Sequence, residues 1–277
     1  MNSKTTVKLT LSEAIARLRL IDDEMMRIAL QDQIELVQFI LRIIMGMPDL
    51  IVAQMETQKD LLQIGHGRSL SLDVLAVDSD GTQYDIEIQR SSSGAQPHRP
   101  RYHLSLMDSV FLRQGDDFDK LPKTKVIFIT EHDCIGNGEL MESFVFRNDK
   151  GHELKTDQEI IYLNTAFSGQ VKPGDENRVA LVHDFRCADP EKMQLAPLAD
   201  RMRFLKNTEK GRTEMSSVIE QYAKQEAEKA AENAKHATLA DVARKLLDTG
   251  KLTPQEVAES TGLSIENVYE LCEPQQA

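Results

Sequence analysis

The sequence predicts a mixed α/β fold followed by an α-helical tail, and two observations carry most of this prediction. Residues 12–45 place apolar side chains at helical spacing, and residues 69–89 contain two runs of alternating aliphatic residues around a Ser-Asp-Gly turn. A further helical stretch and two more strand-like segments follow along the chain. Helix, hairpin, helix and strand in this order indicate a mixed sheet with flanking helices.

Each element has its own signal in the chain. Residues 12–45 predict one or two helices, since apolar residues recur every three or four positions and Pro48 comes just after them. The stretch YHLSLMDSVFLRQG predicts a helix over 102–115 that ends at Gly115. Alternating or apolar runs predict strands over residues 51–54, 69–77, 82–89, 125–130 and 160–164.

Two other segments need separate interpretations. The first ten residues are polar, and we expect them to fray. The most apolar stretch, FILRIIMGM, is short and is interrupted by Arg42, so it predicts a buried helix and not a membrane span.

The composition changes near residue 207, which divides the predicted organisation into three parts. Residues 1–206 form the α/β domain, residues 207–248 a long Ala/Glu/Lys-rich helix or linker, and residues 249–277 a short tail that resembles a helix-turn-helix. The long helix has two interpretations, a solvated spacer or the coiled-coil contact of a homodimer. In the tail Gly262 marks the turn, and residues 264–271 carry two Glu and no Lys or Arg. This charge favours a protein contact over DNA reading.

Charge and cysteine content limit the function classes. The 277-residue chain has a formal net charge of −12, which argues against non-specific coating of nucleic acid or of an anionic membrane. An anionic substrate must therefore meet a local basic patch or bound cations. The three cysteines are isolated and suit free thiols in a reducing cytoplasm. The N-terminus lacks the pattern of a signal peptide, so we expect a cytoplasmic protein.

The hairpin register decides whether two acids of SLDVLAVDSDGTQYDIEIQR meet. A three-residue loop with glycine in its left-handed last position pairs Asp73 with Glu87. A two-residue Asp80-Gly81 loop would instead put these acids on opposite faces. In the first register Asp73 and Glu87 share a face with Gln89 and Ser71, and the opposite, apolar face is formed by Leu72, Val74, Ala76, Tyr84, Ile86 and Ile88.

Paired in this way, Asp73 and Glu87 have Cβ atoms roughly 5 Å apart and repel each other. A hard divalent cation such as Mg²⁺ turns this repulsion into a favourable arrangement, because it prefers oxygen ligands and takes one or two carboxylates. Such an ion activates water and polarises a phosphoryl oxygen, so the pair predicts a phosphodiesterase centre.

A stretch without acids follows the pair, over residues 88–107. It contains three arginines and two histidines, namely Arg90, Arg99, Arg101, His98 and His103. In so acidic a chain, this stretch suggests a wall that contacts phosphate. The alternative is a solvated loop that leads into the next helix.

The order of these segments resembles the PD-(D/E)XK nucleases of the Rpn type, which are recombination-promoting nucleases often labelled transposases. The likeness runs over residues 20–204 and is carried by GRSLSLDVLAVDSDGTQYDIEIQR, RPRYHLSLMDS and GDDFDKLPKTKVIFITE; it extends more loosely to the tail. It implies a DNA endonuclease that depends on Mg²⁺ or Mn²⁺, has a restriction-endonuclease-like core and acts in recombination or mobile elements.

Carried over by position, the resemblance makes Asp73 and Glu87 the metal ligands and Gln89 the third member of the motif. Two positions depart from the family pattern. Leu72 stands where the family-naming proline is expected, and Gln89 replaces the usual lysine. Gln89 can orient water or a phosphate oxygen, but it brings no positive charge.

The resemblance also suggests supporting residues. Many relatives use an acid from the first helix, for which Asp23 and Glu35 are candidates; an N-cap role for Asp23 and solvent exposure for Glu35 are the alternatives. Arg101 and Tyr102 match a basic-aromatic pair, which implies phosphate contact and packing respectively. Arg90 and Arg99 are further candidates for binding the substrate.

Two rival functions remain open. One is a catalytically silent interaction protein with the same fold, which binds a partner through its helical tail. The other is RNA cleavage, because carboxylate–metal chemistry does not distinguish the sugar.

Overall fold

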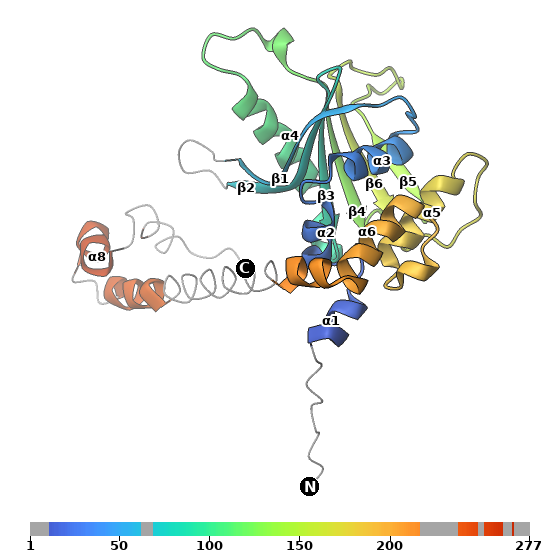
Figure 1. Ribbon diagram of the computed structural model, residues 1–277. Coiled ribbons are helices and arrows are strands. Elements are labelled where there is room, and N and C mark those ends of the chain that lie inside the picture. Colours follow the sequence, from blue (N-terminus) through green and yellow to red (C-terminus); the bar gives the residue numbers. More distant parts are fainter. Residues whose placement is uncertain (1–10, 62–68, 217–237, 249–251, 263–267, 269–277) are drawn as a thin grey trace. The chain divides into compact units, whose positions relative to one another are not determined.

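The computed structural model describes the chain except for residues 1–10, 62–68, 217–237, 249–251, 263–267 and 269–277 (Figure 1). The chain divides into two compact units, Met1–Met215 and Ser216–Ala277. The candidate site belongs to the first unit. The predicted frayed end lies outside the described residues, as do residues 217–237, half of the Ala/Glu/Lys-rich segment for which a dimer contact was considered.

Within the described residues, the N-terminal part contains three helices where one or two were predicted. They are α1 (Leu11–Arg17), α2 (Asp23–Leu30) and α3 (Ile34–Met45). Asp32 adopts a left-handed backbone with φ of 56°, which separates α2 from α3. The FILRIIMGM stretch lies mostly in α3 and buries Ile40, Leu41 and Ile44, as predicted. No described helix is long and apolar enough to cross a membrane.

A six-stranded mixed sheet forms the centre of the first unit, in the order β1-β2-β3-β4-β6-β5. The first three strands form an antiparallel meander, β3, β4 and β6 are parallel, and β5 pairs antiparallel with β6. The strands are β1 (Val52–Leu61), β2 (Leu70–Asp78), β3 (Gln83–Gln89), β4 (Thr124–Thr130), β5 (Met141–Phe144) and β6 (Gln158–Asn164).

All five predicted strands are present with shifted ends, and β1 is much longer than predicted. The edge strand β5 was not predicted, because its four residues, MESF, contain no apolar run. It pairs with β6 on one side only, which is typical of a short edge strand.

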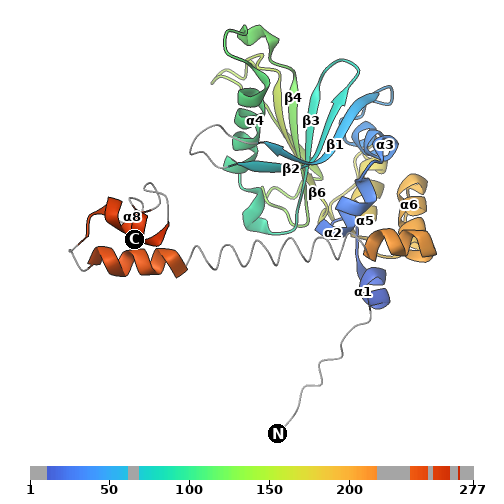
Figure 2. The same ribbon diagram turned by 60° about the vertical axis from the view of Figure 1, so that its left-hand side comes forward.

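Helices cover both faces of the sheet (Figures 1 and 2). One face carries α4 (His98–Phe111), which connects β3 to its parallel neighbour β4. The other face carries α2 and α3 together with α5 (Glu176–Arg186) and α6 (Ala196–Asn207). Short 3-10 turns complete the unit at η1 (Ser92–Ala95), η2 (Phe118–Lys120) and η3 (Pro190–Lys192).

The predicted ends of α4 were wrong. The helix begins at His98, four residues before the expected start, and it ends at Phe111 instead of Gly115. Pro100 is tolerated there because the first helical turn has no use for its missing N–H. Gly115 adopts a left-handed backbone, with φ of 89°, in the turn that follows.

The predicted three-residue hairpin loop is confirmed. Val74 pairs with Ile86 and Ala76 with Tyr84. The backbone N–H of Asp78 donates to Thr82 O at 3.0 Å, as that register requires. Gly81 closes the loop with φ of 83°, a conformation that favours glycine.

One residue of the predicted apolar face is placed differently. Leu72 packs in the cluster beneath α4, together with Leu104, Val126 and Phe128, and not with the face that carries Val74. The β1–β2 ladder pairs Lys59 with Leu72 and Thr57 with Val74 but omits the pair between them. That omitted pair contains Gln58, whose φ is 53°. The strands are therefore distorted beside Asp73.

The second unit has its own small core. Residues 238–248 are helical, and α8 (Pro254–Thr261) follows with a capping box between Thr253 and Glu256. Gly262 ends α8 with φ of 74°, at the predicted turn. The core is formed by Ala243, Val257, Ala258 and Val268. The predicted last helix, apart from Val268, lies outside the described residues.

Candidate active site

The candidate site lies where β2 and β3 stop pairing. Val74 and Ile86 form the last backbone pair, and Asp73 and Glu87 occupy the next opposed positions. The backbone N–H of Asp73 donates to Glu87 Oε1 at 3.0 Å, and the backbone N–H of Ile88 donates to Asp73 Oδ2 at 3.0 Å. Each carboxylate therefore satisfies a backbone donor of the opposite strand. The structure brings the two predicted acids together.

Arg99 of α4 closes this end of the hairpin. Its Nη2 donates to Glu87 Oε2 at 2.7 Å, and its Nη1 donates to Gln89 Oε1 at 2.5 Å and to Gly94 O at 3.0 Å. The guanidinium also lies over the Phe128 ring, 5.4 Å from its centroid. A Cβ at Gly94 would lie 2.2 Å from Gln89 Cδ, so a glycine is required for Gln89 to lie here.

Two further residues complete the site, and the sequence analysis missed one of them entirely. Asp85 and His103 are both fully buried, and His103 Nδ1 lies 2.7 Å from Asp85 Oδ2. Arg99 Nε donates to His103 Nε2 at 3.3 Å. Asp85, Glu87 and His103 each offer a ligand atom within 4.8 Å of the other two. The signal for Asp85 was its alternation with Glu87 and Gln89 in DIEIQ, which places all three on one face.

Burial dominates the electrostatics of these groups. It raises the pKa of Glu87 well above the usual value, with further contributions from the charges of Asp85 and Asp73. Burial likewise raises the pKa of Asp85 and of Asp73. At Asp73 the hydrogen bond from the Ile88 N–H and the charge of Arg99 lower the pKa and partly offset this rise. Burial lowers the pKa of His103 to about 4. Burial therefore favours the neutral form of each of these four groups.

The donor set fits a divalent cation. Three carboxylates, those of Asp73, Asp85 and Glu87, lie around a single bonded guanidinium, that of Arg99. Asp85 Oδ1 is buried and has no hydrogen-bond partner. Carboxylate oxygens are the ligands that hard divalent ions prefer in proteins.

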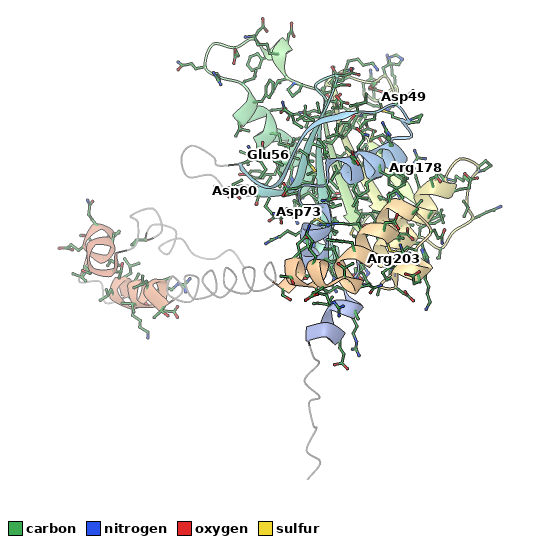
Figure 3. The ribbon with its side chains drawn as sticks, in the orientation of Figure 1. Asp49, Glu56, Asp60, Asp73, Arg178 and Arg203 are labelled. Atoms are coloured by element: carbon green, nitrogen blue, oxygen red, sulfur yellow. The ribbon has the colours of Figure 1, made fainter. Side chains whose placement is uncertain are left out.

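Polar side chains of β1 and α2 also reach Asp73. Gln58 Nε2 donates to Asp73 Oδ1 at 3.4 Å, and Arg27 Nη2 donates to Gln58 Oε1 at 3.1 Å. Asp23, the first residue of α2, has a raised pKa because of its burial and then because of the charge of Asp73. In Figure 3, Asp73 is labelled together with two acids of β1, Glu56 and Asp60.

The structure separates the two candidate acids of the N-terminal helices. Asp23 lies close enough to Asp73 to interact with it electrostatically. Glu35 is exposed and lines a groove between α3 and α6 together with Arg42 and Arg201. The N-cap of α2 is Asp22, so the alternative N-cap role for Asp23 was wrong.

The arginines of the basic stretch have different surroundings, and their predicted contact with phosphate stays a prediction. Arg90 is 49% exposed, but it pairs with Asp22 at 3.3 Å and with Glu131 at 3.1 Å. Arg101 is exposed on α4, and Tyr102 is half-buried against the cluster beneath α4. Of the arginines in this stretch, Arg99 is the one bonded to both Glu87 and Gln89.

A family model described as PD-(D/E)XK nuclease family transposase matches residues 31–249, well over half of the chain. Neither the curated proteins nor the solved structures contained a match. The matched range includes the whole hairpin and α4, and the mixed six-stranded sheet with flanking helices agrees with the expected restriction-endonuclease-like core.

Proposed function

Because the chain belongs to the PD-(D/E)XK nuclease family transposases, we propose that it is a divalent-metal-dependent endonuclease that hydrolyses phosphodiester bonds of DNA. The observation that carries this proposal is the placement of Asp73 and Glu87 where the hairpin stops pairing, with the Glu87 carboxylate accepting from the Asp73 N–H and the Asp73 carboxylate accepting from the Ile88 N–H. The transposase description of the family supports a role in recombination or mobile elements.

In this proposal Asp73 and Glu87 hold Mg²⁺ or Mn²⁺ through their carboxylate oxygens. When bound, such an ion polarises a phosphoryl oxygen and lowers the pKa of a coordinated water. Gln89 orients the water or a phosphate oxygen by hydrogen bonding, since its amide both donates and accepts. Gly94 and Arg99 position Gln89 for this task.

In this proposal, arginines of α4 bind the phosphate groups of DNA. The Arg99 side chain is 38% exposed beside Glu87, and Arg101 is exposed two residues further along the helix. Arginine binds phosphate oxygens through two parallel N–H groups. A chain with a net charge of −12 needs such local cations to approach DNA. We also place the protein in the cytoplasm, because its isolated cysteines suit a reducing compartment.

The test is cleavage of supercoiled plasmid DNA by the full chain with Mg²⁺ or Mn²⁺. Asp73→Asn and Glu87→Gln are expected to reduce cleavage by about a hundredfold or more, because each removes a charged ligand. Asp60→Asn is the matched control, as Asp60 is an exposed acid on the neighbouring strand β1. Circular dichroism establishes that each variant is folded.

Several outcomes would contradict the proposal. Full cleavage by either folded site variant would remove Asp73 or Glu87 from the chemistry. A wild-type chain that cuts neither plasmid nor single-stranded DNA would indicate a silent interaction protein. Cleavage of RNA in preference to both DNA forms would replace the proposed substrate.

A further inference from the structure

Asp85, Glu87 and His103 form a compact group beside the proposed catalytic pair. They come from two elements, because Asp85 and Glu87 alternate along β3 while His103 projects from α4. Their ligand atoms lie within 4.8 Å of one another, and all three side chains are buried. Two carboxylates and one imidazole within this distance can contract around a single ion.

An independent observation points to a missing ligand at this group. Asp85 is fully buried, and its Oδ1 has no hydrogen-bond partner. Leaving a buried polar atom unpaired costs about 1–3 kcal/mol, and more for a charged group. Native proteins rarely retain such an atom without a water or an ion.

Charge favours a cation as the missing ligand, because burial raises the pKa of these carboxyl groups and a positive ion would stabilise their ionised forms. Asp73, Asp85 and Glu87 contribute three potential negative charges, and Arg99 is the cation bonded to Glu87. One doubly charged ion together with Arg99 balances the three carboxylates. Buried charges are stable only when they are paired or coordinate a metal.

The nitrogen ligand narrows the choice of ion. Mg²⁺ prefers an all-oxygen environment, whereas imidazole suits transition ions. We propose that Asp85, Glu87 and His103 form a second cation site, distinct from Asp73 but sharing Glu87, that takes a divalent transition ion such as Mn²⁺ in preference to Mg²⁺. The proposal deepens the proposed nuclease function, on which it rests through the shared Glu87.

Filling this site has a consequence for Arg99. At present Arg99 Nε donates to His103 Nε2, so the ring proton lies on Nδ1 and faces Asp85. An ion bound to Nδ1 requires the proton to lie on Nε2, which then no longer accepts from Arg99. The ion and the Arg99–His103 bond therefore exclude each other. Ion binding frees Arg99 from His103, and its half-exposed guanidinium becomes available to phosphate.

The first experiment needs no substitution and no DNA. The metal-free full chain is titrated with MnCl₂, and the bound Mn²⁺ is examined by pulsed electron paramagnetic resonance. The proposal expects two Mn²⁺ per chain, one of which shows coupling to the ¹⁴N of an imidazole. An absence of nitrogen coupling at saturation would overturn it.

The second experiment separates this proposal from the nuclease function. His103→Gln and Asp85→Asn are expected to weaken one of the two Mn²⁺ sites at least about tenfold and to leave Mg²⁺ binding unchanged. Asp73→Asn is expected to weaken the other site. If the His103 and Asp85 variants fold and bind Mn²⁺ like wild type, the proposal of a second site is wrong and the nuclease proposal is unaffected. If these variants lose one ion while the wild type fails to cleave DNA, the second site is supported and the nuclease proposal is wrong.

Discussion

Arg99 Nη2 donates to Glu87 Oε2 across 2.7 Å, which joins α4 to the end of β3. The Arg99 side chain is 38% exposed, whereas that of Glu87 is 1% exposed. A buried carboxylate thus depends on a cation that solvent and a phosphate group can both reach. This asymmetry gives the first prediction.

Replacing Arg99 should destabilise the protein more than replacing its exposed neighbour Arg101. Arg99→Ala leaves Glu87 without its cation and is expected to lower the free energy of unfolding by about 1–3 kcal/mol. Arg101→Ala should change it by less than about 0.5 kcal/mol, as is typical of an exposed side chain. Urea unfolding at pH 7 measures both. Equal losses in the two variants would show that the pair with Glu87 contributes nothing.

Divalent cations should stabilise the folded chain through Asp73. An ion that binds only the folded state adds about 2.7 kcal/mol to the free energy of unfolding when its concentration is about 100 times its Kd. Thermal unfolding with and without MgCl₂ should show this increase in wild type and in Asp60→Asn. Asp73→Asn should lose most of it, and EDTA should abolish it in every variant. A metal effect that is unchanged by Asp73→Asn would place the ion elsewhere.

The buried His103 should make stability depend on pH. Its pKa in the folded chain is lowered to about 4 by burial, and an unfolded histidine titrates near 6.5. Between these values the unfolded state binds the extra proton, so the contribution of His103 is complete above pH 6.5 and is lost as the pH falls toward 4.

The matched variant His103→Gln isolates this effect from the titration of Asp85 and Glu87. As the pH falls from 7 to 4, wild type should lose about 3 kcal/mol relative to the variant. Urea unfolding at a series of pH values provides the comparison. A constant difference between the two proteins would show that His103 titrates normally in the folded state.

The hairpin turn should depend on Asp78 more than on its glycine. Asp78 Oδ1 accepts from the backbone N–H groups of Asp80 at 2.9 Å and Thr82 at 2.8 Å, and Oδ2 accepts from the Tyr84 hydroxyl at 2.9 Å. Asp78→Ala removes all three bonds and is expected to cost about 2–4 kcal/mol. Gly81→Ala meets no atom within 4 Å and should cost only the left-handed backbone, about 1–2 kcal/mol.

Chemical unfolding ranks these variants, with Asp80→Ala as the control for an exposed acid in the same loop. The reverse order, with the glycine substitution more harmful than Asp78→Ala, would contradict the assignment of the turn to Asp78.

Local chemistry allowed much of the site to be predicted from the sequence. The alternation along the hairpin and the glycine of its loop are properties of neighbouring residues, and together they set the register that brings Asp73 beside Glu87. The same alternation also places Asp85 on the face of Glu87 and Gln89, although Asp85 was not among the predicted site residues.

The remaining contacts depend on residues far apart in the chain. Arg90 pairs with Glu131, 41 residues away in sequence, a contact that the local pattern of the basic stretch does not encode. Whether Arg99 turns toward Glu87 or solvent depends on how α4 lies across the sheet, which no local pattern encodes. Leu72 changed sides because β1 and β2 are distorted at Gln58, whose left-handed backbone has no signature in its residue type.

The two hydrogen bonds that the Asp73 and Glu87 carboxylates accept from the opposite strand also bear on how the hairpin assembles. A strand shifted by one residue would turn these acids to different faces and leave two backbone donors, those of Asp73 and Ile88, without acceptors. Misaligned chains thereby lose stability as well as the pairing of the two proposed metal ligands. The same two contacts consequently favour both the correct register and the proposed ligand arrangement.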